Sequence, residues 1–387
     1  MNNILFLLRL WPVYGGGETV TICLANEMVK RDWNVHVLYF KHQTREKLPF
    51  IDSRIKSCQI ENVDCDEFNF SVKSSIKAEQ YAIAYIKQHA IDCVIDQWWP
   101  VEYIKHIKDE TGVKMVKCLH QAFYTPKLEA PGGKAAVKRI FQSLYIPYKK
   151  KQVVNKTNSF LSYVDKYVFL SSAFQRQFEE FSKCKENNKL DSIPNPLVFE
   201  NKISEEEFAQ KENIVLLVAR MLESQKRITA AIKAWANIEK RNENWKFVIV
   251  GEGPDLNNYR NLVASLNLKN VHFEGFQDPL PYYKSAKIFV MTSYVEGFSM
   301  TLVESQQYGV VPVVMDSFLA LHDIIEDGYN GLITPNGDVK QYSEALDSLM
   351  NDETRRCKLA KNGLVSCERF KVTKVVDSWE KLFDSIA

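Results

Sequence analysis

The chain has 387 residues, of which 45% are hydrophobic and 25% are charged, a composition typical of a globular protein long enough for two domains. Lys and Arg together number 50 against 48 Asp and Glu, which gives a net charge of +2. This balance excludes a protein that binds nucleic acid through overall positive charge, so any anion site must come from the local placement of cations.

The cysteines and the apolar segments indicate where the protein works. None of the eight cysteines forms a Cys-x-x-Cys pair, which favours reduced thiols in a cytosolic protein over a zinc site. The apolar start at residues 4–8 lacks a basic leader and a small-residue cleavage site. No stretch reaches the ~20 apolar residues that a membrane-spanning helix needs. We therefore expect a cytoplasmic protein that can touch a membrane without crossing it.

In the first half of the chain, short apolar runs alternate with helical patterns. Apolar residues recur at helical spacing in Glu18–Arg31 and Lys77–His89. Alternation of this kind predicts parallel strands joined by crossover helices. The predicted strands are Ile4–Leu10, Asn34–Phe40, Cys93–Asp96, Lys114–Leu119 and Tyr167–Leu170.

The second half repeats this pattern with strands that are almost wholly apolar, as strands covered on both faces are. The chain is therefore expected to be an α/β protein with two parallel sheets. Strands are predicted at Ile214–Val218, Lys246–Val250, Val271–Phe273, Ile288–Met291 and Val311–Val314. Helices are predicted at Arg227–Lys240, Pro254–Ser265, Ser299–Tyr308, Val339–Met350 and Asp352–Ser366.

The two halves meet in residues 183–213, which are rich in Lys, Glu, Asn and Ser and contain two prolines. We place the hinge there and predict an N-terminal domain at 1–195 and a C-terminal domain at 196–369. The last stretch, Val372–Ile386, has apolar residues on one side of a helix. Residues 370–387 are therefore expected to pack back on the first domain.

Gly15, Gly16 and Gly17 stand between the first predicted strand and the first predicted helix. Glycines let the backbone approach an anion closely, and a helix N-terminus offers unpaired N–H groups and the positive end of a dipole. The spacing is not the Gly-x-Gly-x-x-Gly of dinucleotide-binding proteins. An anion site and a plain strand-to-helix turn explain these glycines equally well.

Arg220 and Lys226 follow the strand predicted at Ile214–Val218. Open α/β sheets bind ligands at the carboxyl ends of their strands. Arg can bind a phosphate through two parallel hydrogen bonds, while Lys acts as a point charge. The alternative is a pair of solvated surface cations.

Glu296 and Glu304 are separated by seven residues, and Gly297, Phe298 and Ser299 lead into a predicted helix after the first of them. The free N–H groups of that first turn suit a phosphate or sugar hydroxyls. Two carboxylates, which only accept hydrogen bonds, suit a polyhydroxylated ligand such as ribose or a hexose. The alternative is a capped helix with two ordinary surface glutamates.

With these motifs in this order, the chain resembles the retaining glycosyltransferases of family 4, the glycosyl transferases group 1. Their GT-B fold has two Rossmann-like domains that face each other across a cleft. The resemblance runs through nearly the whole chain and is most specific in residues 214–338. The segment from Glu296 to Glu304 resembles the family's paired glutamates, Arg220 and Lys226 resemble its diphosphate clamp, and Gly15–Glu18 resembles its N-terminal glycine loop.

The resemblance implies how the nucleotide of the donor is held. Glu304 would bind the ribose hydroxyls, and the glycine loop at residues 15–17 would lie against the donor. Arg220 and Lys226 would neutralise the departing diphosphate, which makes them catalytic as well as binding residues.

The resemblance also implies which residues face the transferred sugar. Glu296, together with the backbone of Gly297, Phe298 and Ser299, would face the donor sugar. His120, at the end of a predicted strand, matches the family's active-site histidine near that sugar. Without the resemblance, His120 is equally well explained as an ordinary histidine at a strand end.

Enzymes of this family transfer a hexose with retention, from a nucleotide-diphosphate sugar to a glycan or lipid-linked acceptor. For this chain the resemblance implies a role in the synthesis of bacterial cell-surface polysaccharides, such as capsule or lipopolysaccharide. No cofactor or metal is expected, because the cations take the metal's place and no Asp-x-Asp stands in a loop after a predicted strand. The diphosphate itself would help to deprotonate the acceptor, so no dedicated general base is assigned.

The chain departs from the family pattern at several positions beside the site. The usual Gly before the clamp Arg is Ala219, and the usual Gly after the Lys is Arg227. The usual Ala-Met-Ala after the second glutamate is Ser-Gln-Gln at residues 305–307. None of these changes removes a charged partner, so activity is still expected.

Residues 131–164 contain seven Lys and Arg and no Asp or Glu, interleaved with aromatic and aliphatic residues. Such a segment can lie on an anionic membrane surface, and a solvated basic helix is the alternative. Trp98 and Trp99, like Phe123 and Tyr124, follow predicted strands. Their rings suit an acceptor sugar, although core packing competes for at least one tryptophan.

Two other functions remain open. A sugar-nucleotide epimerase of the same fold would convert the sugar nucleotide with no acceptor present. An inactive scaffold would lack the charged partners, whereas Arg220, Lys226, Glu296 and Glu304 are all present. The sequence leaves open the base and sugar of the donor, the acceptor and its linkage position, and the oligomeric state.

Overall fold

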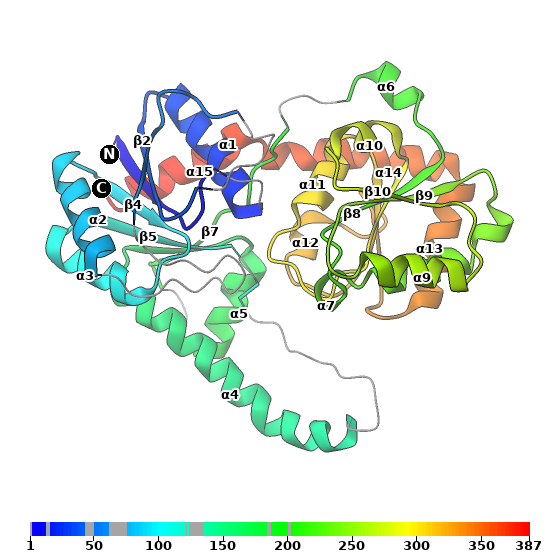
Figure 1. Cartoon of the computed structure of the whole chain (residues 1–387), viewed down its shortest axis with the longest axis horizontal. Helices are drawn as coiled ribbons and strands as arrows, with labels where there is room; N and C mark the ends of the chain where they lie inside the picture. Colours follow the sequence, from blue (N-terminus) through cyan, green and yellow to red (C-terminus); the bar gives the residue numbers. More distant parts are fainter. Residues whose placement is uncertain are drawn as a thin grey trace. The chain divides into compact units, whose positions relative to one another are not determined.

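The computed structural model describes residues 2–12, 16–42, 50–61, 76–120, 122–123, 135–183, 187–199 and 203–387, with the backbone alone for residues 135–145. The contacts within the chain divide it into two units (Figure 1). Unit 1 comprises Met1–Val198 and Val372–Ala387, and unit 2 comprises Phe199–Lys371. The sequence analysis places the boundaries at 195–196 and 369–370.

Unit 1 contains a parallel sheet, which among the described residues has seven strands in the order β3-β2-β1-β4-β5-β6-β7. All four residues of β4 are buried, as expected for a strand covered on both faces of its sheet. The strands are β1 Asn3–Leu7, β2 Asn34–Tyr39, β3 Lys56–Gln59, β4 Cys93–Asp96, β5 Lys114–Leu119, β6 Lys166–Phe169 and β7 Leu190–Ser192. The helices are α1 Gly16–Lys30, α2 Ile76–Gln88, α3 Val101–Thr111, α4 Ala135–Leu161, α5 Ser172–Ser182 and α15 Val372–Asp384.

Unit 2 contains a second parallel sheet, of six strands within residues 203–371, in the order β10-β9-β8-β11-β12-β13. Its core joins the apolar strand residues to large side chains from the helices, among them Trp235 and Tyr342. The strands are β8 Ile214–Val218, β9 Lys246–Val250, β10 Val271–Gly275, β11 Ile288–Met291, β12 Val311–Met315 and β13 Leu332–Thr334. The helices are α6 Glu205–Ala209, α7 Glu223–Lys226, α8 Ile228–Ala236, α9 Leu256–Ser265, α10 Leu280–Ser285, α11 Met300–Gln307, α12 Leu321–Ile324, α13 Val339–Asn351 and α14 Glu353–Ser366.

The last helix, α15, returns to unit 1 after the chain has completed unit 2. Arg31, just past the end of α1, donates hydrogen bonds to Asp377 at 2.7 Å and to Glu380 at 2.8 Å. Trp33 packs its ring 5.2 Å from that of Phe383. The apolar face predicted from the sequence is thus buried against α1 and the turn that follows it.

Each sheet has one point where its strand order reverses. In unit 1 this switch point lies between β1 and β4, and in unit 2 it lies between β8 and β11. Chain segments that leave two such strands diverge to opposite sides of the sheet, so a crevice opens at the carboxyl ends. The prediction of two parallel α/β domains is confirmed. In the described part of the chain, no helix combines the length and the apolar character needed to cross a membrane.

Candidate active site

The switch point of unit 2 brings together the cation motif and the first glutamate. Arg220 and Lys226 follow β8, Glu296 follows β11, and the two strands are hydrogen-bonded neighbours. The Nζ atom of Lys226 donates to Oε1 of Glu296 at 2.7 Å, and Oγ of Ser293 donates to the same oxygen at 2.6 Å. Two motifs that lie 70 residues apart in sequence therefore meet in one ion pair.

Burial excludes the interpretation of the two glutamates as ordinary surface residues. Glu296 and Glu304 are each 7% exposed. An ionised carboxylate is seldom this buried unless it is paired or hydrogen-bonded. Both are hydrogen-bonded here, Glu296 to Lys226 and Glu304 to Tyr283, so the structure holds these carboxylates in fixed positions.

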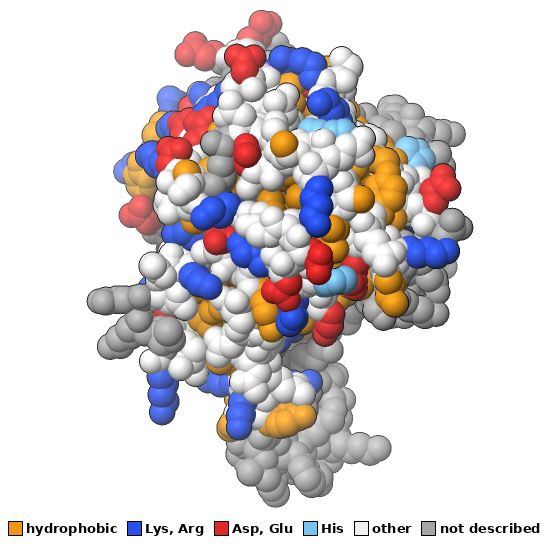
Figure 2. All heavy atoms as spheres, turned by 90° about the vertical axis from the view of Figure 1, so that its left-hand side faces the viewer, with side chains coloured by type: hydrophobic (Ala, Val, Ile, Leu, Met, Phe, Trp, Pro, Cys, Tyr) orange, Lys and Arg blue, Asp and Glu red, His pale blue; other side chains and the backbone are white. Residues whose placement is uncertain are grey.

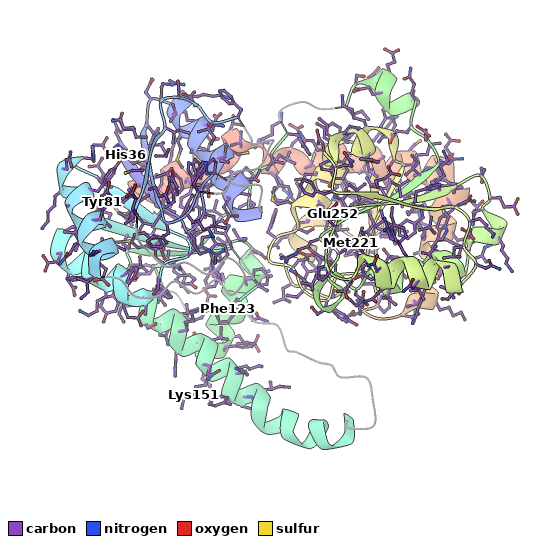
Figure 3. All side chains as sticks on the ribbon, in the orientation of Figure 1. His36, Tyr81, Phe123, Lys151, Met221 and Glu252 are labelled. Atoms are coloured by element: carbon purple, nitrogen blue, oxygen red, sulfur yellow. The ribbon has the colours of Figure 1, made fainter. Side chains whose placement is uncertain are left out.

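Arg220 differs from its neighbours because its guanidinium is exposed and has no partner among residues 203–387. Its backbone, by contrast, is fixed on both sides. Ala219 donates to the carbonyl of Val250 at 3.0 Å, and Met221 donates to the carbonyl of Glu252 at 2.7 Å; Figure 3 labels Met221 and Glu252, which lie close together. A rigid backbone thus presents a cation whose donors are all available.

Glycines in the loop after β9 permit this close backbone contact. A Cβ atom on Gly251, whose φ is +136°, would lie 2.0 Å from the carbonyl oxygen of Ala219. A Cβ atom on Gly253 would lie 2.3 Å from the carbonyl oxygen of Met221. Any side chain at these two positions would push away the loop that carries Arg220.

The N-terminus of α11 has free backbone donors beside Glu296. Ser299 precedes the helix as its N-cap without a side-chain hydrogen bond to the first turn. Within residues 203–387, the N–H groups of Gly297, Phe298 and Ser299 meet no protein acceptor. The Phe298 ring is buried against Phe370 at 5.4 Å between ring centres, which fixes the loop. These N–H groups can therefore donate to an anion or a hydroxyl.

Glu304 lies in the middle of α11 and accepts a hydrogen bond from the Tyr283 hydroxyl at 2.9 Å. Burial raises the pKa of Glu304 to about 7, and the hydrogen bond from Tyr283 opposes this shift. Tyr283 belongs to α10, whose C-terminus is held by Lys211. The Nζ atom of Lys211 donates to the carbonyls of Tyr283 at 2.8 Å and Ala286 at 2.7 Å, and burial lowers its pKa to about 7.

In unit 1, His120 lies just past β5, next to the N-terminus of α1. A Cβ atom on Gly17 would lie 3.6 Å from the Trp98 ring and 3.7 Å from the His120 ring. The Trp98 and His120 rings stack with 6.2 Å between their centres. Gly17, Trp98 and His120 therefore form one cluster at the switch point of unit 1. Gly16 begins α1 and is exposed, while Gly15 lies outside the described residues.

Both ring nitrogens of His120 are buried and have no hydrogen-bond partner among the residues that the structure describes. Burial, followed by the charge of Lys117, lowers the pKa of His120 to about 4. The ring is therefore neutral near pH 7, with one N–H donor and one acceptor nitrogen free for a ligand.

The aromatic residues predicted to face an acceptor have different surroundings. Trp99 is 1% exposed, stacks on Phe40 at 4.7 Å and donates to the carbonyl of Leu8 at 3.1 Å. Phe123 packs edge-on against Phe178 at 5.5 Å. Trp99 and Phe123 are thus core residues, whereas Trp98 is part of the His120 cluster. Tyr124 lies outside the described residues.

A buried ion pair beneath this cluster is absent from the sequence predictions. Lys117 donates to Asp96, and Asp96 also accepts from the backbone N–H of Trp99 at 2.9 Å. Asp96 and Lys117 occupy paired positions on β4 and β5. Opposite charges within two neighbouring predicted strands could have revealed the pair once the strand register was known.

The basic segment is described only in part. Lys134 lies outside the described residues, and the side chains of Lys138 and Arg139 in α4 are not described. Figure 2 shows Lys side chains, without Asp or Glu, on the described part of α4; Lys151 is labelled in Figure 3. Tyr148 is 57% exposed, and Lys150 lies 4.0 Å above the Phe181 ring. Membrane contact through residues 131–164 stays a prediction.

Unit 2 also has a cavity of about 750 Å³ near the ends of β12 and β13. Its lining includes Asp316, Glu326 and Asp327 together with His322 and Arg369. Asp316 pairs with His322 at 3.0 Å. Three carboxylates make this cavity a poor place for a diphosphate, so the cations after β8 remain the best candidates for that role.

The chain is similar to known glycosyltransferases. Residues 198–365 match the family model of the glycosyl transferases group 1. An N-acetyl-D-galactosaminyltransferase of Campylobacter jejuni, named for the acceptor GalNAc-alpha-(1->4)-GalNAc-alpha-(1->3)-diNAcBac-PP-undecaprenol, is 24% identical over 96% of both chains. The capsular polysaccharide biosynthesis glycosyltransferase CapM of Staphylococcus aureus is 26% identical over 53% of this chain and 50% of its own length.

Solved structures share the fold along the whole chain. The lipopolysaccharide outer core galactosyltransferase WaaB aligns with a TM-score of 0.70 at 19% identity over 99% of both chains. HepE of Anabaena in complex with UDP-glucose aligns with a TM-score of 0.72 at 16% identity over 99% of this chain and 100% of its own. The chain is therefore a glycosyltransferase of the two-domain GT-B fold, and its second domain belongs to the glycosyl transferases group 1.

Proposed function

We propose that this chain is a retaining, metal-independent glycosyltransferase that moves a hexose-type sugar from a nucleotide-diphosphate sugar to a glycan or lipid-linked acceptor. The observation that carries the proposal is the arrangement at the switch point of unit 2. There the exposed guanidinium of Arg220, the Lys226–Glu296 pair and the N–H groups before α11, which meet no acceptor within residues 203–387, all follow the adjacent strands β8 and β11.

These groups fit the charge that develops when a sugar leaves a diphosphate. Arg220 can bind two phosphate oxygens through its planar fork. An ammonium group has three donors, and Lys226 uses one of them on Glu296, so it can bind Glu296 and a phosphate together. Cations fixed before the reaction stabilise the leaving group without further rearrangement. In this proposal the departing diphosphate takes the acceptor's proton, and no cofactor takes part.

Glu304 would hold the ribose of the donor. Its Oε2 atom already accepts from Tyr283, and a carboxylate has further lone pairs for two ribose hydroxyls. Because burial raises the pKa of Glu304 to about 7, the ionised form is costly until hydroxyl donors arrive. Ribose binding would therefore favour the ionised carboxylate.

His120 would contact the transferred sugar, since its two ring nitrogens are buried and lack a partner in the described part of the chain. A neutral imidazole can accept from one sugar hydroxyl and donate to another. Glu296, held in place by Lys226 and Ser293, would bind other hydroxyls of the same sugar. The glycines at residues 15–17 would let the donor approach the N-terminus of α1 closely.

The biological setting is proposed from the relatives. The Campylobacter jejuni enzyme is named for an undecaprenol-linked acceptor, and CapM is named for capsular polysaccharide. We accordingly place this chain in bacterial cell-surface polysaccharide synthesis, in the cytoplasm, with peripheral contact through α4 to the inner face of the cell membrane.

The experiment that tests this function is a donor screen followed by a transfer assay. UDP-, GDP- and ADP-sugars are added separately to the purified protein, and its thermal unfolding is measured with each of them. A donor at 100 times its dissociation constant should add about 2.7 kcal/mol to the free energy of unfolding. The stabilising donor should then be consumed only with an acceptor glycan present, in buffer containing a chelator. Conversion of the donor without an acceptor would indicate an epimerase, and no stabilisation by any donor would contradict the proposal.

A further inference from the structure

Arg227, which directly follows Lys226, has a backbone conformation that normally favours glycine. Its φ is +46° and its ψ is 45°, in the left-handed region, where it ends α7 and precedes α8. Side chains with a Cβ atom strain the backbone in this region. Contacts of the Arg227 side chain must therefore offset this strain.

The guanidinium of Arg227 is buried and joins three segments at the carboxyl ends of the strands. Its Nε atom donates to the carbonyl of Thr292 at 2.8 Å, and Nη2 donates to Oδ1 of Asn336 at 2.7 Å. Nη2 also lies 3.1 Å from Sδ of Met315. Thr292 follows β11, Met315 ends β12 and Asn336 follows β13. One side chain therefore links the turn at residues 226–227 to the carboxyl ends of three strands.

All these partners are electrically neutral. The guanidinium also lies over the Tyr294 ring, whose centre is 4.3 Å away. No carboxylate within residues 203–387 forms an ion pair with Arg227, although the residue is only 7% exposed. A buried cation without a counter-ion is costly. This cost is lowered when an anion binds nearby.

Lys226, unlike the two arginines, has a carboxylate partner in the described part of the chain. Glu296 neutralises Lys226 in the structure, whereas Arg220 and Arg227, near the end of β8, form no ion pair within residues 203–387. Arg220 is exposed and screened by solvent, whereas Arg227 is buried, where a charge acts more strongly on its surroundings.

We propose that Arg227 is a third cation of the diphosphate site. Its positive charge acts electrostatically on the diphosphate from beneath the turn at residues 226–227. Its hydrogen bonds hold that turn against the loop carrying Glu296. This inference rests on the proposed function, since it takes the diphosphate to bind at Arg220 and Lys226. A third cation favours a pyrophosphate as ligand, because a buried positive charge stabilises a ligand more strongly when that ligand carries more negative charges.

Arg356 provides a matched control. It is also buried, at 6% exposure, and donates to backbone carbonyls, those of Leu349 at 2.6 Å and Met350 at 3.3 Å. Its guanidinium lies 5.3 Å from the ring centre of Trp245. Trp245 precedes β9, so Arg356 lies near the amino ends of the strands. Arg227→Gln and Arg356→Gln thus remove comparable buried cations, one near the carboxyl ends of the strands and one near their amino ends.

The test is titration calorimetry of UDP, GDP and ADP, and then of the monophosphate of whichever nucleotide binds. Arg227→Gln should weaken diphosphate binding roughly tenfold and monophosphate binding less, while Arg356→Gln should bind like wild type. Arg227→Lys, which keeps the charge, should retain most of the affinity. If Arg227→Gln does not fold, Arg227→Gly replaces it, since glycine suits the left-handed backbone.

Two results would overturn the inference: diphosphate affinity in Arg227→Gln equal to that in Arg356→Gln, or Arg227→Lys as weak as Arg227→Gln. In either case a separate loss of affinity in Arg220→Ala would leave the proposed function intact. If Arg220→Ala also bound the diphosphate like wild type, the proposed function itself would fail.

Discussion

The hydroxyl of Tyr283 donates to Glu304 at 2.9 Å, which connects α10 to the middle of α11. The rings of Tyr283 and Tyr308 are nearly parallel, with 6.3 Å between their centres. The hydrogen-bond partner of Glu304 is thus itself packed against a second aromatic ring. Burial raises the pKa of Glu304 to about 7, although the hydrogen bond from Tyr283 opposes the shift. The carboxylate proposed to bind ribose therefore titrates close to physiological pH.

Donor binding should consequently depend on pH. Ribose hydroxyls donate to the ionised carboxylate, so affinity should be highest above pH 7 and fall by up to about tenfold per pH unit below it. The phosphates also titrate, so calorimetry on wild type is compared with Glu304→Gln, whose amide does not titrate. The ratio of the two affinities should grow from pH 6 to pH 8. A ratio that stays constant across this range would remove Glu304 from the ribose site.

The same carboxyl should make the stability of the free protein depend on pH. Its pKa is raised in the folded chain from 4.5 to about 7, so its protonated form stabilises the fold. This contribution is fully present below pH 4.5 and is lost as pH rises through about 7. Glu304→Gln should therefore be more stable than wild type at pH 8, by up to about 3 kcal/mol, and similar at pH 4.5. Urea unfolding at both pH values measures this, and equal stabilities at pH 8 would contradict the assigned pKa.

His120 should matter for transfer and not for nucleotide binding. His120→Ala removes two candidate sugar contacts and should lower the transfer rate roughly 10- to 100-fold. The affinity for the nucleoside diphosphate should stay unchanged. Because the pKa of His120 is about 4, its titration should not affect the rate between pH 6 and 9. His272→Ala, at an exposed histidine of β10, is the control, and equal transfer rates in the two variants would exclude a role for His120.

The lysines of α4 should determine membrane binding. Replacing Lys149–Lys151 by Gln should reduce binding to phosphatidylglycerol vesicles at low salt by roughly tenfold or more, at about 1 kcal/mol per cation near the surface. Vesicles of phosphatidylcholine should bind neither form. A variant with Gln at Lys233, Lys358 and Lys361, which are exposed in unit 2, keeps the same net charge change. Equal losses in both variants would mean that α4 has no special part in binding.

The apolar strands could be predicted from the sequence because burial on both faces leaves a continuous signal. β8, β9 and β11 begin and end where the sequence places them. β3, with the sequence Lys-Ser-Cys-Gln, is a polar edge strand, and β7 and β13 have three residues each. Strands this short or this polar have no period that sequence analysis could detect.

The helix predicted at Arg227–Lys240 shows a different limit. In the structure α7 ends at Lys226, Arg227 takes a left-handed conformation and α8 covers only Ile228–Ala236. Arginine has no local preference for that conformation. The contacts that stabilise it come from Thr292 and Asn336, which are remote in sequence.

The positions of the candidate residues relative to the strands could be predicted one by one, but their contacts with each other could not. Arg220 and Lys226 lie at a strand's carboxyl end as expected. The ion pair between Lys226 and Glu296 depends on β8 lying beside β11. Similarly, the partner of Glu304 is Tyr283, which no spacing rule connects to it.

The central claim is that a diphosphate binds to the cations after β8, and its most direct test is the affinity of Arg220→Ala for the nucleoside diphosphate that binds wild type. Arg355→Ala, at an exposed arginine of α14, is the control for loss of one surface charge. Calorimetry should show binding at least roughly tenfold weaker in Arg220→Ala and unchanged in Arg355→Ala. Equal affinity in wild type and Arg220→Ala would contradict the account.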